Sequence, residues 1–397
     1  MNWKTENYWV SPYNFVPEVT EEIKFPDKIE IHDATLRDGE QSPGVVFRKE
    51  EKVDIALRLA DAGVHRIEVG MPAVSQEDRD AISMIVKENP KAELFAFARA
   101  DPRDMQLCMD CGVDGVIIEL PIGKPKLEHQ FHYDIRHALE ISQQAVVSAK
   151  SCGMKAVLFP YDATRCEMED LEFFLNGLTG DCRPDAIGLV DTMGCAGPEA
   201  IAYLTKLYKA KLGIPVEIHV HNDFGMGLAS SIAALKAGAS VVHGCMNGLG
   251  ERCGNVPTEE IVATLGLIYG QDLGVDIGKL VELAQVVEKY SGYMNGVKKP
   301  VTGKGNFVRE SGIGADTIMQ YPLAMFAVNP AYYHQKPSVV LGKKSGLLSV
   351  ELKLSEMNVD LPRETRKKIL GEVKDLGIAK KGLVTDEEFS EIVKKYC

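Results

Sequence analysis

The sequence predicts an α/β protein built on a (β/α)₈ TIM barrel, followed by a linker and a small helical subdomain. Two repeated features support this fold class: glycines that end helical patterns, and short apolar runs that follow them. The glycines are Gly63, Gly112, Gly153, Gly213 and Gly238. Because glycine accepts the left-handed conformation that ends a helix, each one marks a helix end before a new strand.

Eight short apolar runs are the predicted strands. They span residues 29–31, 66–69, 94–98, 116–118, 156–159, 187–190, 216–220 and 240–242. Runs that are apolar throughout are typical of parallel strands buried on both faces. Eight strand–helix units over about 250 residues match a closed barrel. A doubly wound sheet is the alternative, but no glycine-rich dinucleotide fingerprint follows the first run, so the barrel is favoured.

We expect three regions along the 397 residues. Residues 1–27 form an N-terminal arm rich in aromatic side chains, among them Trp3 and Trp9, which should pack on the barrel or on a partner subunit. Residues 28–275 form the catalytic barrel. Residues 276–397 form the linker and the C-terminal helical subdomain.

Composition excludes several classes of partner. The net charge of −12 argues against nucleic acid and against an anionic membrane surface. No apolar run reaches the roughly 18 residues of a membrane span, and the N-terminus lacks the apolar segment of a secretory signal. Nine cysteines without an export signal indicate reduced thiols rather than a disulfide framework. These features predict a cytoplasmic protein.

Polar residues cluster directly after the predicted strands. In a barrel, the carboxyl ends of all strands meet at one mouth, where active sites of this fold lie. The cluster includes Arg37, Asp38, Gln41, Glu68, Glu119, Tyr161, Thr192, His219, His221, Cys253 and Asn255. The sequence therefore predicts an enzyme with its site at this mouth.

The segment His219-Val220-His221 has the spacing of a metal-binding pair, because alternate residues of a strand point to the same side. Two histidines packed inside the barrel are the alternative. Asp38 adds a carboxylate and Asn255 an amide oxygen. Two nitrogen and two oxygen ligands suit Zn²⁺, Mn²⁺, Fe²⁺ or Co²⁺, with Mg²⁺ possible, so a divalent metal site is favoured.

Four ordered motifs together resemble one enzyme family. They are DATLRDGEQ at 33–41, IEVGMP at 67–72, HVHND at 219–223 and GLGERCGN at 248–255. This combination is similar to the DRE-TIM metallolyases, above all isopropylmalate, homocitrate and citramalate synthases; hydroxymethylglutaryl-CoA lyase also belongs to them. The resemblance implies a homodimer that condenses acetyl-CoA, or another acyl-CoA, with a 2-oxo acid to give a 2-hydroxy dicarboxylic or tricarboxylic acid. The alternative is a metal-dependent lyase or aldolase that cleaves a related 3-hydroxy acid or acyl-CoA.

The resemblance also implies roles for individual residues. Asp38, His219 and His221 would bind the metal, with Asn255 as a further ligand, direct or through water. Arg37 would neutralise the alkoxide that forms in the transition state.

Further roles belong to the substrate and to the support of Arg37. Glu68 would hold Arg37 or a metal-bound water, or else form only a salt bridge. Thr192 would donate a hydrogen bond to the substrate carboxylate, or else cap a helix. Gln41 and Glu119 are expected to contact the substrate.

The chain departs from the synthases at their acid–base groups. Gly314 stands where the synthases have a catalytic histidine, and Met325 and Phe326 lie where a catalytic tyrosine is expected. Such groups contribute about 10²–10⁴-fold each, so other residues must replace them or the reaction differs. Tyr161 and Cys253 are the foremost replacements; the others are Arg309, Tyr332, Tyr333 and His334. Cys253 has an alternative as a small buried residue that fills space.

Overall fold

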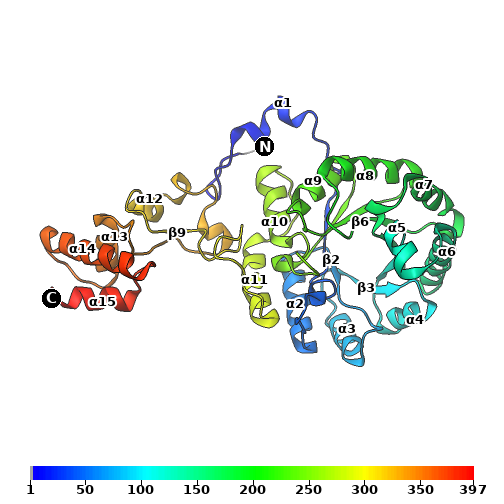
Figure 1. The fold of residues 1–397 in the computed structure, drawn as a ribbon, viewed down its shortest axis with the longest axis horizontal. Coiled ribbons are helices and arrows are strands. Elements are labelled where there is room, and N and C mark those ends of the chain that lie inside the picture. Colours follow the sequence, from blue (N-terminus) through cyan, green and yellow to red (C-terminus); the bar gives the residue numbers. More distant parts are fainter. Residues whose placement is uncertain (1–2) are drawn as a thin grey trace. The chain divides into compact units, whose positions relative to one another are not determined.

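The computed structural model describes residues 3–397, which divide into two compact units. One unit spans Tyr13–Asn295, and the other combines residues 3–12 with Gly296–Cys397 (Figure 1). The predicted aromatic arm therefore divides after Pro12; its residues 1–2 lie outside the described residues. Within residues 3–397, none of the helices has the length and apolar content needed to cross a lipid bilayer.

The first unit is a closed barrel of eight parallel strands in sequential order, in which β1 pairs with β8. The strands are β1 (Glu30–Asp33), β2 (Arg66–Glu68), β3 (Glu93–Arg99), β4 (Gly115–Pro121), β5 (Lys155–Tyr161), β6 (Ala186–Asp191), β7 (Val216–Val220) and β8 (Val241–Gly244). Each overlaps one of the eight predicted apolar runs. The predicted barrel is confirmed.

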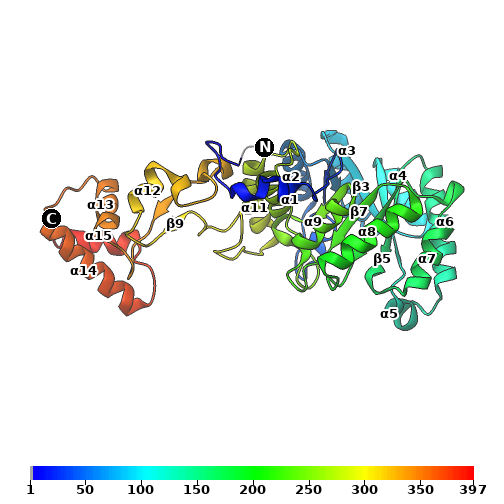
Figure 2. The same ribbon diagram turned by 90° about the horizontal axis from the view of Figure 1, so that it is seen from above.

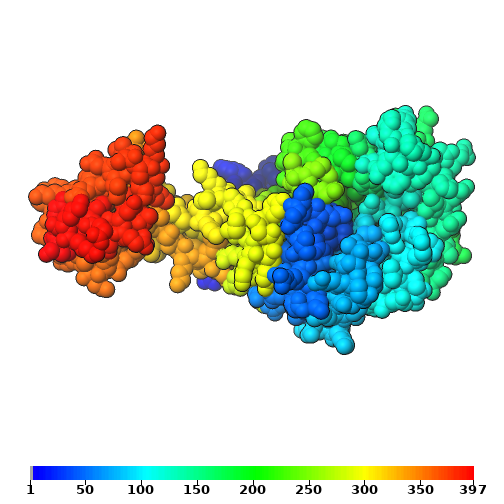
Figure 3. Space-filling model, turned by 60° about the horizontal axis from the view of Figure 1, so that its bottom comes forward, coloured from blue at the N-terminus to red at the C-terminus, as the bar shows by residue number. Residues whose placement is uncertain are grey.

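Helices connect the strands on the outside of the barrel, as α7 and α8 do in Figure 2. They are α2 (Lys49–Asp61), α3 (Gln76–Glu88), α4 (Pro102–Cys111), α6 (Ile135–Ser151), α7 (Met168–Gly177), α8 (Pro198–Leu212) and α9 (Gly227–Ala237). Two further helices, α10 (Thr258–Ala263) and α11 (Ile277–Ser291), follow the last barrel strand. Three short helices, α1 (Pro17–Thr20), α5 (Lys124–Lys126) and α12 (Ala315–Gln320), lie elsewhere in the chain. On the face shown in Figure 3, the early part of the chain, coloured blue to cyan, forms a continuous surface.

Local sequence sets the helix ends. Ser75 caps α3 by accepting a hydrogen bond from the Asp78 amide, and Asp134 caps α6 in the same way through the His137 amide. At the other ends, Gly112 and Gly213 adopt φ of 80° and 59°. All five glycines predicted to end helices have positive φ, as the prediction requires.

Alternate residues of each strand point into the barrel, and aromatic side chains fill much of that interior. Phe95 and Phe97 of β3 cluster with Ile117 of β4 and with Val157 and Phe159 of β5. Each large apolar side chain buried in this way contributes about 1.5–3 kcal/mol. This packed apolar cluster lies beneath the polar side chains at the carboxyl ends of the strands and supports them.

In the second unit, the extended arm pairs with the linker of its own unit. The Trp9 amide donates to the Ala327 carbonyl, and the Asn329 amide donates to the Asn7 carbonyl, both at 2.8 Å. Trp3 and Trp9 lie with ring centroids 6.3 Å apart. The linker also contains a two-stranded parallel sheet of β9 (Val308–Arg309) and β10 (Ser338–Val339).

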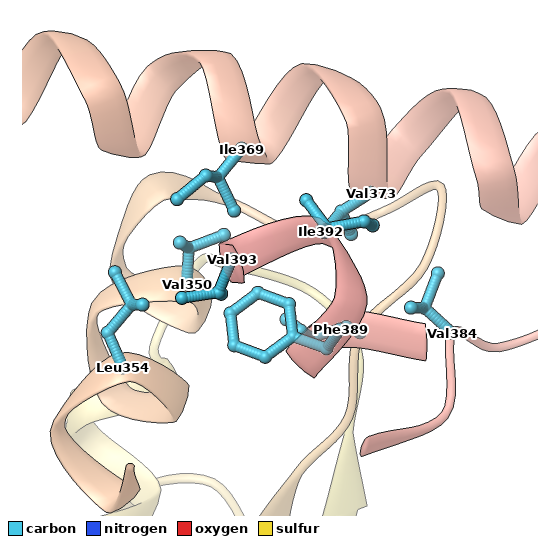
Figure 4. Close-up of a cluster of buried hydrophobic side chains, with 9 residues drawn as sticks. Val350, Leu354, Ile369, Val373, Val384, Phe389, Ile392 and Val393 are labelled. Atoms are coloured by element: carbon cyan, nitrogen blue, oxygen red, sulfur yellow. The ribbon is translucent and has the colours of Figure 1, made fainter. Parts of the chain in front are cut away.

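Three helices close the second unit: α13 (Leu347–Glu356), α14 (Arg363–Lys380) and α15 (Asp386–Lys394). Their apolar faces meet in a small core in which Val350, Ile369 and Phe389 are almost fully buried (Figure 4). Thr385 caps α15 through the Glu388 amide. This core gives the C-terminal segment a packed interior of its own.

Candidate active site

A cavity of about 160 Å³ lies at the carboxyl ends of the strands. Its lining comes from seven strands or the loops that follow them: Arg37, Asp38, Gln41, Phe97, Glu119, Gln130, Phe131, Phe159, Tyr161, Val190, Thr192, His219, His221 and Glu251. Most residues predicted for the site are among them. The predicted residues outside this lining are Glu68, Cys253 and Asn255.

Asp38, His219 and His221 form a buried cluster whose possible ligand atoms lie within 4.8 Å of one another. The Nε2 atoms of His219 and His221 lie 3.1 and 3.5 Å from Asp38 Oδ2. Both histidines point inward because they are two residues apart at the end of β7. The three side chains therefore converge on one point.

The protonation states suit metal ligation. Burial lowers the pKa of His219 to about 4, so its imidazole is neutral. Burial alone would raise the pKa of Asp38, but Arg37 and hydrogen bonds from the two histidines hold it well below its usual range. Asp38 Oδ1 has no hydrogen-bond partner among the described residues. A carboxylate and two imidazoles are a donor set that suits a divalent metal ion.

The loop after β8 brings Asn255 beside this cluster, since Asn255 pairs with His221 through the backbone. Gly250 of the same loop has φ of 143°, and a Cβ atom there would lie 2.3 Å from Asn255 Nδ2 and 3.3 Å from Asp38 Oδ1. Ser42 fastens the loop, because its Oγ donates to the Gly250 carbonyl and accepts from the Gly250 amide. Glycine is thus required for this close approach.

Arg37 is held at the mouth by Glu68. Arg37 Nε donates to Glu68 Oε1 at 2.6 Å, and its guanidinium stands 4.2 Å from the Phe97 ring centroid. Burial opposes its charge, but Glu68 and Asp38 together raise the pKa of Arg37 above its usual value. Arg37 Nη1 also contacts Gln41 and Asp38, both at 3.3 Å. A fixed positive charge therefore lies next to the cluster.

Glu119 and Thr192 face the same cavity from β4 and from the end of β6. Burial raises the pKa of Glu119 to about 7, and Arg37 offsets part of that rise. Thr192 Oγ1 accepts the Asp162 amide at 2.8 Å, which leaves its hydroxyl proton available to a ligand. Thr192 therefore supports the loop after β5 instead of capping a helix.

Tyr161 and Cys253 differ in position. Tyr161, at the end of β5, lines the cavity, and Lys126 Nζ lies 5.2 Å from its ring centroid. Cys253 is exposed, so its alternative role as a buried space-filling residue is wrong. The neighbouring Arg252 donates from Nε to Asp223 Oδ1 at 2.9 Å.

Sequence reasoning missed several lining residues. Phe97 and Phe159 occupy inward positions of predicted strands, so the period-two pattern contained a signal for both. Gln130 and Phe131 come from a short helical segment between β4 and α6 and follow no strand end. Nothing in their spacing indicated that this segment reaches the mouth.

A second cluster of one carboxylate and two histidines was also missed: His32, Glu217 and His243, all buried inside the barrel. His243 Nε2 lies 2.8 Å from Glu217, and Arg66 Nη1 lies 2.5 Å from the same carboxylate. The rings of His32 and His243 stack with centroids 4.0 Å apart and planes 15° apart. The nitrogen lone pairs of each imidazole lie in the plane of its ring. Because the two planes are nearly parallel, these lone pairs do not point at one ion, and the geometry does not fit a shared metal ion.

Comparisons with known proteins agree with this architecture. The HMGL-like family matches residues 28–287. Homocitrate synthase AksA of Methanothermobacter thermautotrophicus is 37% identical over 387 residues, which cover 98% of this chain and 97% of that protein. The 2-isopropylmalate synthase of Methanocaldococcus jannaschii is 35% identical over 384 residues, which cover 96% and 74%.

Among solved structures, HMG-CoA lyase of Bacillus subtilis superposes with a TM-score of 0.63 at 20% identity, covering 70% of this chain and 98% of that one. At this identity the likeness concerns the barrel fold alone. The match over the barrel and the full-length relatives together establish the family. The chain belongs to the HMGL-like family of DRE-TIM barrel proteins.

Proposed function

We propose that this protein is a divalent-metal-dependent acyltransferase that condenses acetyl-CoA, or another acyl-CoA, with a 2-oxo acid. The product is a 2-hydroxy dicarboxylic or tricarboxylic acid. The single observation that supports this most strongly is the convergence of Asp38, His219 and His221 beside the ion-paired Arg37. The names of the relatives, homocitrate synthase and 2-isopropylmalate synthase, agree with it.

The metal ion would be held by Asp38, His219 and His221, with Asn255 next to them. When bound, it supplies Lewis acidity to the keto oxygen of the substrate. We assign manganese, zinc, magnesium, iron or cobalt as the candidates, since all accept nitrogen and oxygen ligands.

Arg37 stabilises the negative charge that builds up on the keto oxygen during carbon–carbon bond formation. Its guanidinium is oriented before substrate arrives, because Glu68 fixes one edge of it at 2.6 Å. A charged donor that needs no reorganisation is worth several kcal/mol at such a position. Glu68 is therefore a positioning residue, and Arg37 is the catalytic one.

Thr192 donates its free hydroxyl proton to the carboxylate of the 2-oxo acid, and Gln41 lines the same cavity. We assign proton transfer to Tyr161, which faces the cavity from the end of β5. In the alternative lyase, the thiol of Cys253 is one group that could carry the proton. That residue is exposed and does not line the cavity, so no contact favours it.

We further propose a cytoplasmic homodimer as the working form. The free state of all nine cysteines is compatible with a reducing compartment. Light scattering on the purified protein tests the dimer: a mass near 87 kDa, twice the 43.6 kDa chain, supports it, and a mass near 44 kDa contradicts it.

The function is tested by metal analysis and by release of free CoA thiol from acetyl-CoA in the presence of a panel of 2-oxo acids. We expect thiol release that requires both a 2-oxo acid and a divalent ion. Arg37→Gln should lower that rate by about 100-fold or more while the bound metal is retained. Thiol release that is independent of every 2-oxo acid would contradict the proposal.

A further inference from the structure

We propose that Glu119 excludes 2-oxo acids that carry a second carboxylate, so that the substrate of this protein has an uncharged tail. This inference rests on the proposed function, because it concerns the part of the same cavity that would receive the tail. Among the mostly polar residues that line this cavity are three apolar side chains, Phe97, Phe159 and Val190. Glu119 lines the cavity together with them.

The position of Glu119 is fixed by β4. In the parallel ladder it lies opposite Phe159 of β5 and Arg99 of β3. Arg99 does not neutralise it, because the Arg99 guanidinium donates to both oxygens of Asp104 at 2.8 and 2.9 Å. The Glu119 backbone carbonyl accepts from the Ala100 amide at 3.2 Å, which leaves the carboxylate directed at the cavity.

The cations around the mouth are already paired with carboxylates of their own. Arg37 is bound to Glu68. Arg165 forms two hydrogen bonds with Asp162, at 2.7 and 2.8 Å. A second substrate carboxylate would therefore find no unpaired arginine in this lining.

The cavity lining also contains several carboxylates, because Glu251 and Asp38 face the cavity together with Glu119. Unlike the arginines, Lys126 near the Tyr161 ring is bound to a neutral group, because its Nζ donates to Gln130 Oε1 at 3.1 Å. Lys126 is outside the lining. It is the group that would have to anchor a second carboxylate if one were accepted.

Burial raises the pKa of Glu119 to about 7 in the metal-free protein. A divalent ion bound at Asp38 would favour the ionised form of Glu119, as any nearby opposite charge does. The loaded enzyme therefore presents an anion to the substrate tail. In a partly dehydrated cavity, two carboxylates repel each other more strongly than in water.

The test uses the full chain loaded with Mn²⁺ and two matched pairs of 2-oxo acids. Oxaloacetate is paired with 4-methyl-2-oxopentanoate, and 2-oxoglutarate with 5-methyl-2-oxohexanoate. In each pair an isopropyl group replaces the terminal carboxylate, so shape is conserved and charge changes. Calorimetry measures binding of all four acids, and CoA release from acetyl-CoA is measured in parallel.

We expect the uncharged member of each pair to bind about tenfold or more tightly, because like charges placed together are strongly disfavoured. Glu119→Gln keeps the shape of the side chain and should bring the ratio to within about threefold through a gain for the dicarboxylates. Lys126→Met should leave the wild-type preference unchanged. If Glu119→Gln does not fold, the wild-type ratios alone decide.

Equal or tighter binding of oxaloacetate or 2-oxoglutarate by the wild type would overturn the inference, and so would an unchanged ratio in folded Glu119→Gln. Binding of none of the four acids would overturn it as well. Binding with the expected ratio but without CoA release from any acid would contradict the condensation and leave the charge preference standing. The two failures are therefore distinguishable.

Discussion

Two clusters of one carboxylate and two histidines lie inside the barrel, and β7 contributes to both. His219 and His221 belong to the upper cluster with Asp38, whereas Glu217 belongs to the deeper cluster with His32 and His243. In the upper cluster the imidazole nitrogens converge on one carboxylate oxygen. In the deeper cluster the two rings stack face to face. Orientation, and not residue type, decides which cluster fits an ion.

The charges around the two clusters differ as well. Arg66 neutralises Glu217 in the deeper cluster, and burial lowers the pKa of His243 to about 3, so the group is neutral as it stands. In the upper cluster one arginine, Arg37, faces both Asp38 and Glu68. One negative charge is left without compensation there. The uncompensated negative charge of the upper cluster favours a bound cation, whereas the deeper cluster is already neutral and needs none.

Asp38→Ala should break the upper cluster and produce the largest effect. Loss of the carboxylate removes the metal and with it several kcal/mol of transition-state stabilisation, so turnover should fall by at least about 10³-fold. Metal content by mass spectrometry and CoA release measure this. Asp110→Ala, on the exposed face of α4, is the matched control. Full metal content and turnover in Asp38→Ala would contradict the assignment.

Glu217→Gln should damage the deeper cluster in a different way. It leaves the charge of Arg66 buried without a partner, which should lower the free energy of unfolding by about 3 kcal/mol. Urea denaturation measures this loss, and metal content should change far less than in Asp38→Ala. The double variant Arg66→Met, Glu217→Gln removes both charges and should recover part of the stability. A stable Glu217→Gln that loses its metal would reverse the two roles.

Gly250→Ala tests how closely the loop after β8 approaches the upper cluster. The added Cβ would collide with Asn255 Nδ2, and φ of 143° is strained for alanine, so we expect a loss of about 2 kcal/mol in unfolding free energy. Metal affinity, measured by calorimetry, should weaken as well. Gly44→Ala is the control, because Gly44 also has positive φ but no atom within 4 Å of its added Cβ. Equal effects of the two substitutions would exclude crowding of the cluster.

The raised pKa of Glu119 makes the stability of the protein depend on pH. Burial raises the pKa of Glu119 from 4.5 to about 7, so the folded protein binds this proton more tightly than the unfolded chain does. The wild type should therefore lose stability relative to Glu119→Gln as pH rises from about 4.5 to 7, by roughly 2.5 kcal/mol. Urea denaturation of the metal-free proteins across this range measures it, with the exposed Glu88→Gln as control. A difference that does not change with pH would contradict the raised pKa.

The sequence predicts the barrel well because all eight strands are apolar and five of them also follow a glycine that ends the preceding helix. The convergence of Asp38, His219 and His221 follows from strand ends meeting at one mouth and from the period of two along β7. The second cluster was not predictable, since the stacking of His32 on His243 depends on packing between distant strands.

Other features of the structure could not be predicted from the sequence for related reasons. Phe131 reaches the cavity through the conformation of a connecting segment, which residue spacing does not encode. Likewise, the division of the aromatic arm after Pro12 depends on backbone hydrogen bonds to Ala327 and to neighbouring linker residues, more than 300 positions away. Long-range pairing of that kind leaves no local pattern.

The five residues of β7 also link assembly of the barrel to its chemistry. A slip of β7 by one residue against β6 or β8 would turn Glu217, His219 and His221 outward together, because a one-residue shift exchanges the two faces of a strand. Misclosed barrels would therefore lack both the internal ion pair and the ion-binding point. If the proposed metal site forms only in a correctly closed barrel, metal uptake during refolding would report on the register of β7.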